Sequence, residues 1–295
     1  MTTRADLQTT LETLPDEVAT LYSTYLAGEI RLLTTTYGLL PGVPFDNMQR
    51  RIQDVVDLGS GQPVWAMLCA QGLPYTRVTV IDFRRSLLVY MQHLLQEQGA
   101  KTVTIAQASS LTHLPLANQT ADLIHAHCPS RALHHAEWET LLRECWRVLR
   151  PGGCLYVLEM GLGEPVAGRS PATRRLWDLV QGAAAQVGRR AYRAEQLENW
   201  QQLTGDMLDR AGFSARSSAH WQVTHGPGAT HRHWNEAVLA LLWCDWLPLM
   251  EQTGRWSRQE LRSLWAEVRQ EMEHPAFHGF LPLATFWGIK TSKGS

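Results

Sequence analysis

The pattern of apolar and polar positions changes period several times along this chain, which predicts short strands that alternate with helices. Runs rich in Val, Ile and Leu are separated by segments whose apolar residues recur every three or four positions. Strands are expected at residues 54–58, 77–82, 102–105, 121–126, 154–159, 214–223 and 281–290. Such alternation is typical of right-handed βαβ units, so we expect a largely parallel sheet with helices on both faces.

Helices are expected between these runs and before the first of them. Gly99, Gly188 and Gly212 follow three of the helical patterns, where glycine commonly ends a helix. One helix is expected to pass through residues 64–68, after the first strand. The others are expected at residues 5–37 (divided at Pro15), 84–98, 136–149, 171–187, 194–203, 206–211, 231–250 and 257–273. We interpret residues 1–45 as an N-terminal helical cap segment. Residues 46–295 then form one domain, with a Trp-rich helical insertion at about 225–280.

The charge balance argues against several classes of function. The 295 residues carry 27 basic and 28 acidic side chains, which gives no electrostatic case for binding nucleic acid or an anionic membrane. No apolar run is long enough to span a bilayer, and the N-terminus lacks the pattern of a signal peptide. The five cysteines include no CxxC pair, which favours free thiols in a reducing compartment. We expect a cytoplasmic protein, and the sequence does not indicate its oligomeric state.

The stretch from Val55 to Pro63 has the form of a strand that opens into a nucleotide-binding turn. Its apolar run ends at Asp57 and Leu58 and then passes through two glycines, Gly59 and Gly61. Glycine allows a backbone to approach a ligand closely and to adopt positive φ. A turn of this kind fits several nucleotide cofactors.

Two acids help to decide which nucleotide the turn accepts. Asp82 ends the second predicted strand, where a carboxylate can accept hydrogen bonds from both hydroxyls of a ribose. A dinucleotide would also need a third glycine for its pyrophosphate, but that position is Val64, and Pro63 has no amide donor. Negative charge at Asp57 opposes a pyrophosphate and suits an ammonium or sulfonium group.

Four segments resemble the class I S-adenosylmethionine-dependent methyltransferases. Residues 55–61 are similar to the first motif of that family, residues 80–82 to the second, and residues 114–124 to its loop and fourth strand. Residues 142–153, LRECWRVLRPGG, are very close to a segment of the small-molecule branch, which includes quinone-biosynthesis methyltransferases. The resemblance implies a Rossmann-like α/β fold, with a seven-stranded mixed sheet of order 3-2-1-4-5-7-6. It also implies S-adenosyl-L-methionine as the cofactor.

The resemblance further implies which residues would contact the cofactor. They are Asp57, Gly59, Ser60 and Gly61 at the methionine end, Asp82 at the ribose, Phe83 on the adenine, Ser109, Ser110 and Leu111 along the adenine edge, and His125 and Ala126 beside the sulfonium. Two positions depart from the family. Pro63 replaces the usual third glycine, and the acid that reads the adenine amino group is absent from residues 107–110.

His127 and Glu159 are the candidate catalytic residues. Methyl transfer is an in-line displacement, and it needs a general base only where the acceptor carries a proton. His127 follows the fourth predicted strand and Glu159 ends the fifth, so both should face the acceptor. The structural alternatives are a histidine bonded to backbone and a carboxylate that caps a helix. Two H-x-H pairs, at 125–127 and 231–233, lack a carboxylate partner at a family metal position, so no metal is expected.

The function expected from these features is methylation of O, C or N on a small, fairly apolar metabolite, with no nucleic-acid or membrane partner. The Trp-rich half would cover the acceptor. Two alternatives stay open: a methyltransferase-like fold that keeps its cofactor pocket without transferring methyl groups, and an NAD-type oxidoreductase.

Overall fold

The computed structural model describes residues 34, 40, 52–59, 63–73, 75–162, 164–165, 170–225, 246–247, 249–251 and 253–291. The predicted N-terminal helices, Ser60 and Gly61 of the glycine turn, and residues 226–245 of the Trp-rich insertion therefore lie outside the described residues. The elements are β1 (Asp54–Leu58), α3 (Val64–Gly72), β2 (Arg77–Asp82), α4 (Arg85–Glu97), β3 (Val103–Gln107), β4 (Ala121–His127), the 3₁₀ helices η3 (Pro129–Arg131) and η4 (His135–Glu137), α5 (Trp138–Val148), β5 (Leu149–Met160), β6 (Glu164–Pro165), α6 (Pro171–Gln186), α7 (Ala194–Ala211), β7 (Phe213–His225), α9 (Arg258–Glu273) and β8 (Gly279–Lys290).

These strands form one mixed sheet. Its order is β3-β2-β1-β4-β5-β8-β6, and β7 also pairs with β8. The strands from β1 to β5 are parallel to one another, whereas β8 runs antiparallel to β5, β6 and β7. The predicted order 3-2-1-4-5-7-6 is confirmed, because the predicted sixth and seventh strands are β7 and β8. The two-residue strand β6 is an addition that the sequence did not indicate.

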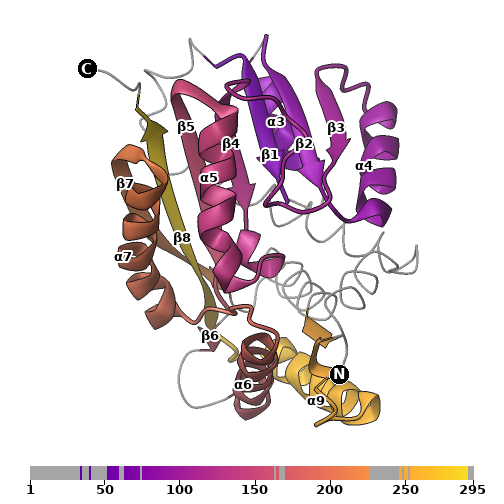
Figure 1. Cartoon of the computed structure of the whole chain (residues 1–295). Coiled ribbons are helices and arrows are strands. Elements are labelled where there is room, and N and C mark those ends of the chain that lie inside the picture. The colour runs from indigo at the N-terminus through magenta and orange to yellow at the C-terminus, as the bar shows by residue number, and fades with distance from the viewer. Residues whose placement is uncertain are drawn as a thin grey trace.

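Helices cover both faces of the sheet, as the alternation of strands and helices predicts. In Figure 1, α5 and α7 lie in front of the sheet and α3 lies behind it. Each face has its own apolar cluster, one that includes Trp65 of α3 and Leu87 of α4, and one that includes Leu142 of α5 and Leu208 of α7. Helices α6 and α9 pack together beyond the carboxyl ends of the parallel strands (Figure 1).

Two predicted boundaries are wrong. The predicted break between residues 203 and 206 does not occur, because α7 is one continuous helix from Ala194 to Ala211. Thr204 is fully buried there, so packing of the inner face outweighs the weak helix propensity of a Thr-Gly pair. Strand β5 begins at Leu149 rather than Cys154, because Leu149 already pairs with Ala121 of β4 ahead of a register shift.

The charged residues of the LRECWRVLRPGG segment have structural partners. Arg147 bonds Glu144, with Nε 2.6 Å from Oε1, and also donates to two backbone carbonyls of the loop before β4, at 2.8 and 3.2 Å. Arg150 bridges Asp122 and Asp54, each at 2.8 Å. This most family-like stretch therefore fixes the loop before β4 and the amino-terminal ends of β1 and β4.

Lys290, the last residue of β8, closes the carboxyl end of α5. Its ammonium donates to the carbonyls of Trp146 and Leu149 at 2.6 and 2.7 Å, and lies 3.9 Å from the centroid of the Trp146 ring. The side chain is buried, and the end of a helix is where unpaired carbonyls and a partial negative charge favour a cation. The final strand is thereby tied to the helix that precedes β5.

Candidate functional site

The carboxyl ends of four parallel strands meet at one edge of the sheet. Leu58 of β1 lies opposite Ile81 of β2 and Ala126 of β4, and His127 lies opposite Leu158 of β5. Gly59 follows β1, Asp82 and His127 end β2 and β4, and Glu159 is the second-last residue of β5. The structure therefore brings the predicted cofactor and catalytic residues of the described part of the chain to one edge.

Gly59 makes the first bend of the glycine turn. Its φ is +67°, and a Cβ there would stand 3.1 Å from Cδ1 of Leu111. Its amide donates to the carbonyl of Ile81 at 2.9 Å. A side chain at this position would be strained by both the backbone angle and the contact, so glycine keeps the turn close to β2 and to the 111 loop.

Asp57 and His125 form a buried pair on the face that α3 covers. Nδ1 of His125 lies 2.8 Å from Oδ1 of Asp57, and the two side chains are 2% and 0% exposed. Trp65 stacks on the imidazole, with ring centroids 3.9 Å apart and planes 13° from parallel. Burial lowers the pKa of His125 although the Asp57 carboxylate raises it. A neutral imidazole has one N–H, so Nδ1 carries it and donates to Asp57.

Asp82 is fully buried beneath an arginine that the sequence interpretation did not include. Arg84 chelates the carboxylate, with Nε 2.9 Å from Oδ1 and Nη2 2.7 Å from Oδ2. The amide of Arg84 also donates to Oδ1, at 2.9 Å, and Nη2 reaches the carbonyl of Gly59 at 3.1 Å. Arg84 thus connects the carboxyl end of β2 to the glycine turn. Its position two residues after Asp82 was the available sequence signal.

The residues expected along the adenine divide into apolar and polar sets. Phe83 and Leu111 are buried in the apolar cluster on the α5 face, which also contains Ala126. Ser109 is exposed, and Ser110 is half-buried with its hydroxyl 2.7 Å from that of Thr112. The residues expected along the adenine are therefore two buried apolar side chains and two serines that are exposed or half-buried.

The two candidate catalytic residues, Glu159 and His127, are both buried. Oε1 of Glu159 accepts the amide of Ser130 at 2.8 Å, so this carboxylate binds the first turn of η3. Burial raises the pKa of Glu159 to about 7, against the opposing effects of Ser130, Arg131 and His127. His127 is 3% exposed and is the last residue of β4, so it lies deeper than the loop position that the sequence suggested.

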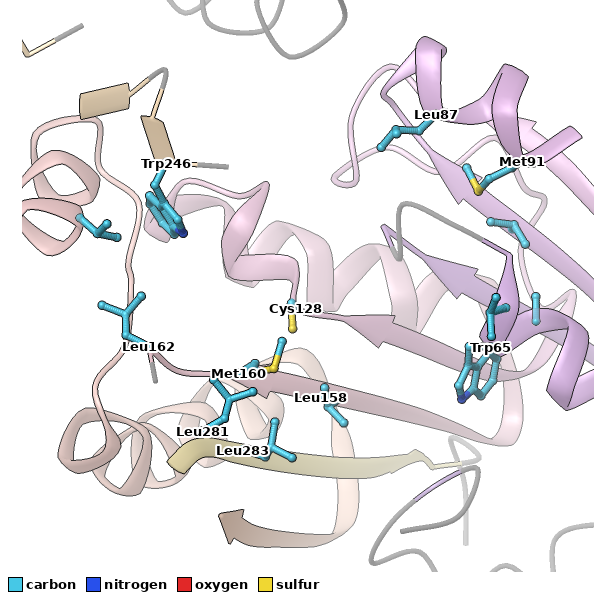
Figure 2. Packing of buried hydrophobic residues seen from close by; sticks show 14 of the residues in the cluster. Trp65, Leu87, Met91, Cys128, Leu158, Met160, Leu162, Trp246, Leu281 and Leu283 are labelled. Atoms are coloured by element: carbon cyan, nitrogen blue, oxygen red, sulfur yellow. The ribbon is translucent and has the colours of Figure 1, made fainter. Parts of the chain in front are cut away.

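Apolar side chains lie at the same end of β4 and β5 as these two residues. Figure 2 shows Cys128 and Met160, which follow and end β4 and β5, with Leu281 and Leu283 of β8 beside them. Cys128 has φ +48° and ψ +50°, a left-handed conformation that is uncommon for a residue with a side chain. That conformation turns the chain from β4 into η3 and places Ser130 on Glu159.

Thiol, metal and membrane features add little to this site. Burial raises the pKa of Cys69 and Cys154 to about 12, so these two thiols stay protonated and inert. Among the residues that the structure describes, no three His, Cys, Asp or Glu side chains are grouped to hold a metal ion. The described helices include none that is long and apolar enough to cross a membrane.

The sheet order, the antiparallel β8 and the glycine turn define the class I methyltransferase fold, and known structures agree. The YcgJ protein from Bacillus subtilis superposes with a TM-score of 0.52 at 15% identity, over 89% of this chain and 98% of that one. A protein of Bacillus halodurans C-125, provisionally assigned as a methyltransferase, gives 0.53 at 16% identity, over 90% and 99%. Identities this low show the fold alone.

The family match is narrower and lies over the site. Residues 55–153 match the family model described as "Methyltransferase domain". A demethylmenaquinone methyltransferase of Anoxybacillus flavithermus is 28% identical over 105 residues, which is 35% of this chain and 43% of that protein. This chain therefore matches less than half the length of that relative.

The described residues fit an adenosyl cofactor in kind. A carboxylate ends β2, Gly59 has no side chain, and Phe83 and Leu111 are apolar residues of one cluster. The conformation of one side chain does not fit, because Arg84 covers the carboxylate that a ribose would use.

Proposed function

We propose that this chain moves a methyl group from S-adenosyl-L-methionine to an O, C or N atom of a small, fairly apolar metabolite. One juxtaposition carries the proposal. A buried carboxylate of the ribose-binding type, Asp82, lies on the same sheet edge as two buried ionisable groups, His127 and Glu159. The cofactor, when bound, supplies an electrophilic methyl group on a sulfonium.

The residues on β1 and β4 suit a cationic ligand. In this proposal Asp57, Gly59, Ser60 and Gly61 line the methionine end, and His125 and Ala126 flank the sulfonium. His125 is neutral because burial lowers its pKa, so it does not repel a sulfonium as an imidazolium would. The Asp57 hydrogen bond keeps the ring in one tautomer and one orientation.

The acceptor side would handle the proton of the acceptor. His127 is proposed as the base or orienting group for an acceptor O–H, N–H or acidic C–H. Glu159 is proposed as the second group, because a carboxyl with a pKa of about 7 can hold or accept a proton near neutral pH. General-base catalysis of this kind contributes about 100- to 10,000-fold in rate.

The apolar side chains at this end of β4 and β5 favour an acceptor with a large apolar surface. Cys128, Met160, Leu281 and Leu283 would contact its ring or chain, whereas His127 would face the atom that receives the methyl group. The name of the Anoxybacillus flavithermus relative specifies demethylmenaquinone as its substrate. We therefore propose an aromatic hydroxyl compound of the quinol type as the first acceptor class to test.

Cofactor binding and product release test the function directly. Calorimetry with S-adenosylmethionine, S-adenosylhomocysteine and NAD should give binding for the two adenosyl compounds. Quinols and simpler phenols, assayed one at a time with S-adenosylmethionine, should release S-adenosylhomocysteine. Binding of NAD alone would favour an oxidoreductase. Tight cofactor binding without product from any acceptor would favour a retained pocket without methyl transfer, a candidate that the cover of Arg84 over Asp82 supports.

Variants of the two buried catalytic candidates can be compared with a variant of an exposed histidine. His127→Ala should lower kcat by about 100-fold or more and leave cofactor affinity unchanged. Glu159→Gln should remove a step in the pH profile of kcat near about 7. His93→Ala is the matched control, because that ring lies on α4 and is 67% exposed. If His127→Ala behaves like the control, His127 has no part in the chemistry.

A further inference from the structure

Arg84 lies where the ribose of an adenosyl cofactor would bind, if the proposed function holds. A carboxylate offers about four acceptor positions, and a ribose diol uses one on each oxygen. Arg84 already donates twice to Oδ1 of Asp82 and once to Oδ2. Asp82 has no exposed surface under this side chain, so a ribose can reach the carboxylate only after the guanidinium moves.

The second contact of Arg84 extends this cover to the glycine turn. Nη2 bonds both Oδ2 of Asp82 and the carbonyl of Gly59, so the guanidinium spans the gap between β2 and β1. Its carbon also lies 5.6 Å from the centroid of Phe83, the residue expected under the adenine. One side chain therefore contacts Gly59, Asp82 and Phe83, which are expected at the methionine end, the ribose and the adenine of the cofactor.

We propose that Arg84 is the residue that sets affinity for the cofactor, by occupying the Asp82 carboxylate in the unliganded protein and yielding it to the ribose diol. Binding exchanges a bidentate, buried ion pair for hydrogen bonds from two neutral hydroxyls. The charge-assisted pair is the stronger of the two, so the exchange weakens binding. Removing the guanidinium leaves Asp82 available and tightens binding.

Calorimetry on three proteins tests the exchange, with S-adenosylhomocysteine as the probe. Arg84→Gln should bind it at least about tenfold more tightly than the unchanged protein. Arg84→Lys keeps the charge but has no planar fork, so it should fall between the two. Arg85→Gln is the matched control, because Arg85 is the exposed neighbour at the start of α4 and changes the net charge equally. Its affinity should equal that of the unchanged protein.

An analogue without ribose hydroxyls shows whether Arg84 competes with the ribose for Asp82 or whether its replacement simply loosens the binding site. The gain in Arg84→Gln should vanish with the 2′,3′-dideoxy form of S-adenosylhomocysteine, because that ligand has no groups for Asp82. An equal gain with both ligands would overturn the proposal. So would weaker binding of S-adenosylhomocysteine to Arg84→Gln, since Arg84 would then be a ligand of the cofactor.

Thermal unfolding shows whether the Arg84→Gln variant is folded. Arg84→Gln should unfold at a lower temperature than the unchanged protein, and saturating S-adenosylhomocysteine should raise its Tm more. If Arg84→Gln does not fold, the Arg84→Lys affinity decides the matter, and a value at or below that of the unchanged protein overturns the proposal. If neither the unchanged protein nor any variant binds the cofactor, the proposed function itself has failed. Binding without any gain in the variants refutes this inference alone.

Discussion

The two halves of the carboxyl edge treat buried acids differently. On β1, Asp57 is paired with the imidazole of His125, and on β2, Asp82 is paired with the guanidinium of Arg84. On β5, Glu159 is equally buried but accepts a backbone amide, and burial raises its pKa to about 7. In the proposed function, β1 and β2 belong to the cofactor half of this edge, where each acid is paired with a side chain, and β5 belongs to the acceptor half. The acceptor half holds a group that can change its protonation near neutral pH, as proton-transfer chemistry requires.

The largest effect should follow from breaking the strongest pair in the cofactor half. Asp82→Ala leaves the guanidinium of Arg84 buried without its carboxylate, which should lower the free energy of unfolding by about 3–5 kcal/mol. Chemical denaturation measures the loss. The double variant Asp82→Ala/Arg84→Gln should recover part of it, and a double variant as unstable as the single one would show that the pair itself is not the cause.

The next effect concerns pH and the acceptor half. Glu159 has a raised pKa in the folded protein, so the folded state holds the proton more tightly than the unfolded state. Stability from this group is full below about 4.5 and is lost as pH rises to about 7, by roughly 3 kcal/mol in total. Glu159→Gln should remove that part of the pH dependence, as measured by denaturation at a series of pH values.

Glu144 provides the opposite sign as a control for that series. Arg147 and the amide of Leu114 lower its pKa, so its contribution is present above its usual range and is lost as pH falls. Glu144→Gln should therefore lose stability near neutral pH and little in acid. If Glu159→Gln and Glu144→Gln change the pH dependence of the free energy of unfolding in the same direction, the opposite pKa shifts inferred for the two carboxyls are wrong.

A smaller loss should follow from opening the pair beneath Trp65. Asp57→Ala removes the acceptor of the Nδ1–H of His125, and a buried donor without a partner costs about 1–3 kcal/mol. Asp57→Asn keeps an acceptor oxygen, so urea denaturation should find it closer to the unchanged protein. An Asn variant as damaged as the Ala variant would mean that charge, rather than the hydrogen bond, holds the ring.

The smallest effect is expected outside both halves. Arg210 pairs with Glu139 at 2.7 Å on the surface, where the side chains are 57% and 44% exposed. Solvent screens such a pair, so Arg210→Ala should change the free energy of unfolding by less than about 1 kcal/mol. If Arg210→Ala lowers the free energy of unfolding as much as Asp82→Ala does, burial does not explain the difference between the exposed and the buried pairs.

The sequence predicted the fold most accurately where the signal is local. Strands β1 and β2 have the expected bounds, since each is an apolar run that stops at an acid or a glycine. The helix α7 was divided in error because the sequence does not show that Thr204 faces the interior. Packing between elements keeps α7 continuous through Thr204, and such packing cannot be derived from one amino-acid sequence.

The positions of the candidate residues near strand ends could be predicted from the sequence, but their contacts could not. Asp82 and Glu159 could be assigned to strand ends from the alternation alone. Their partners could not, because the fork of Arg84 turns back over Asp82 through a tight junction, and Ser130 reaches Glu159 only through the left-handed Cys128. The stacking of Trp65 on His125 similarly depends on the register between β1 and β4, which are far apart in the sequence.

The central place of β8 has a consequence for the order in which this protein forms during synthesis. The strand lies between β5 and β7, and its last residue, Lys290, closes α5 from about 140 positions further along the chain. While a ribosome still holds residues 279–290, β5 has an unpaired edge and β7 has no neighbour in the sheet. Nascent chains at that stage expose strand edges that favour aggregation.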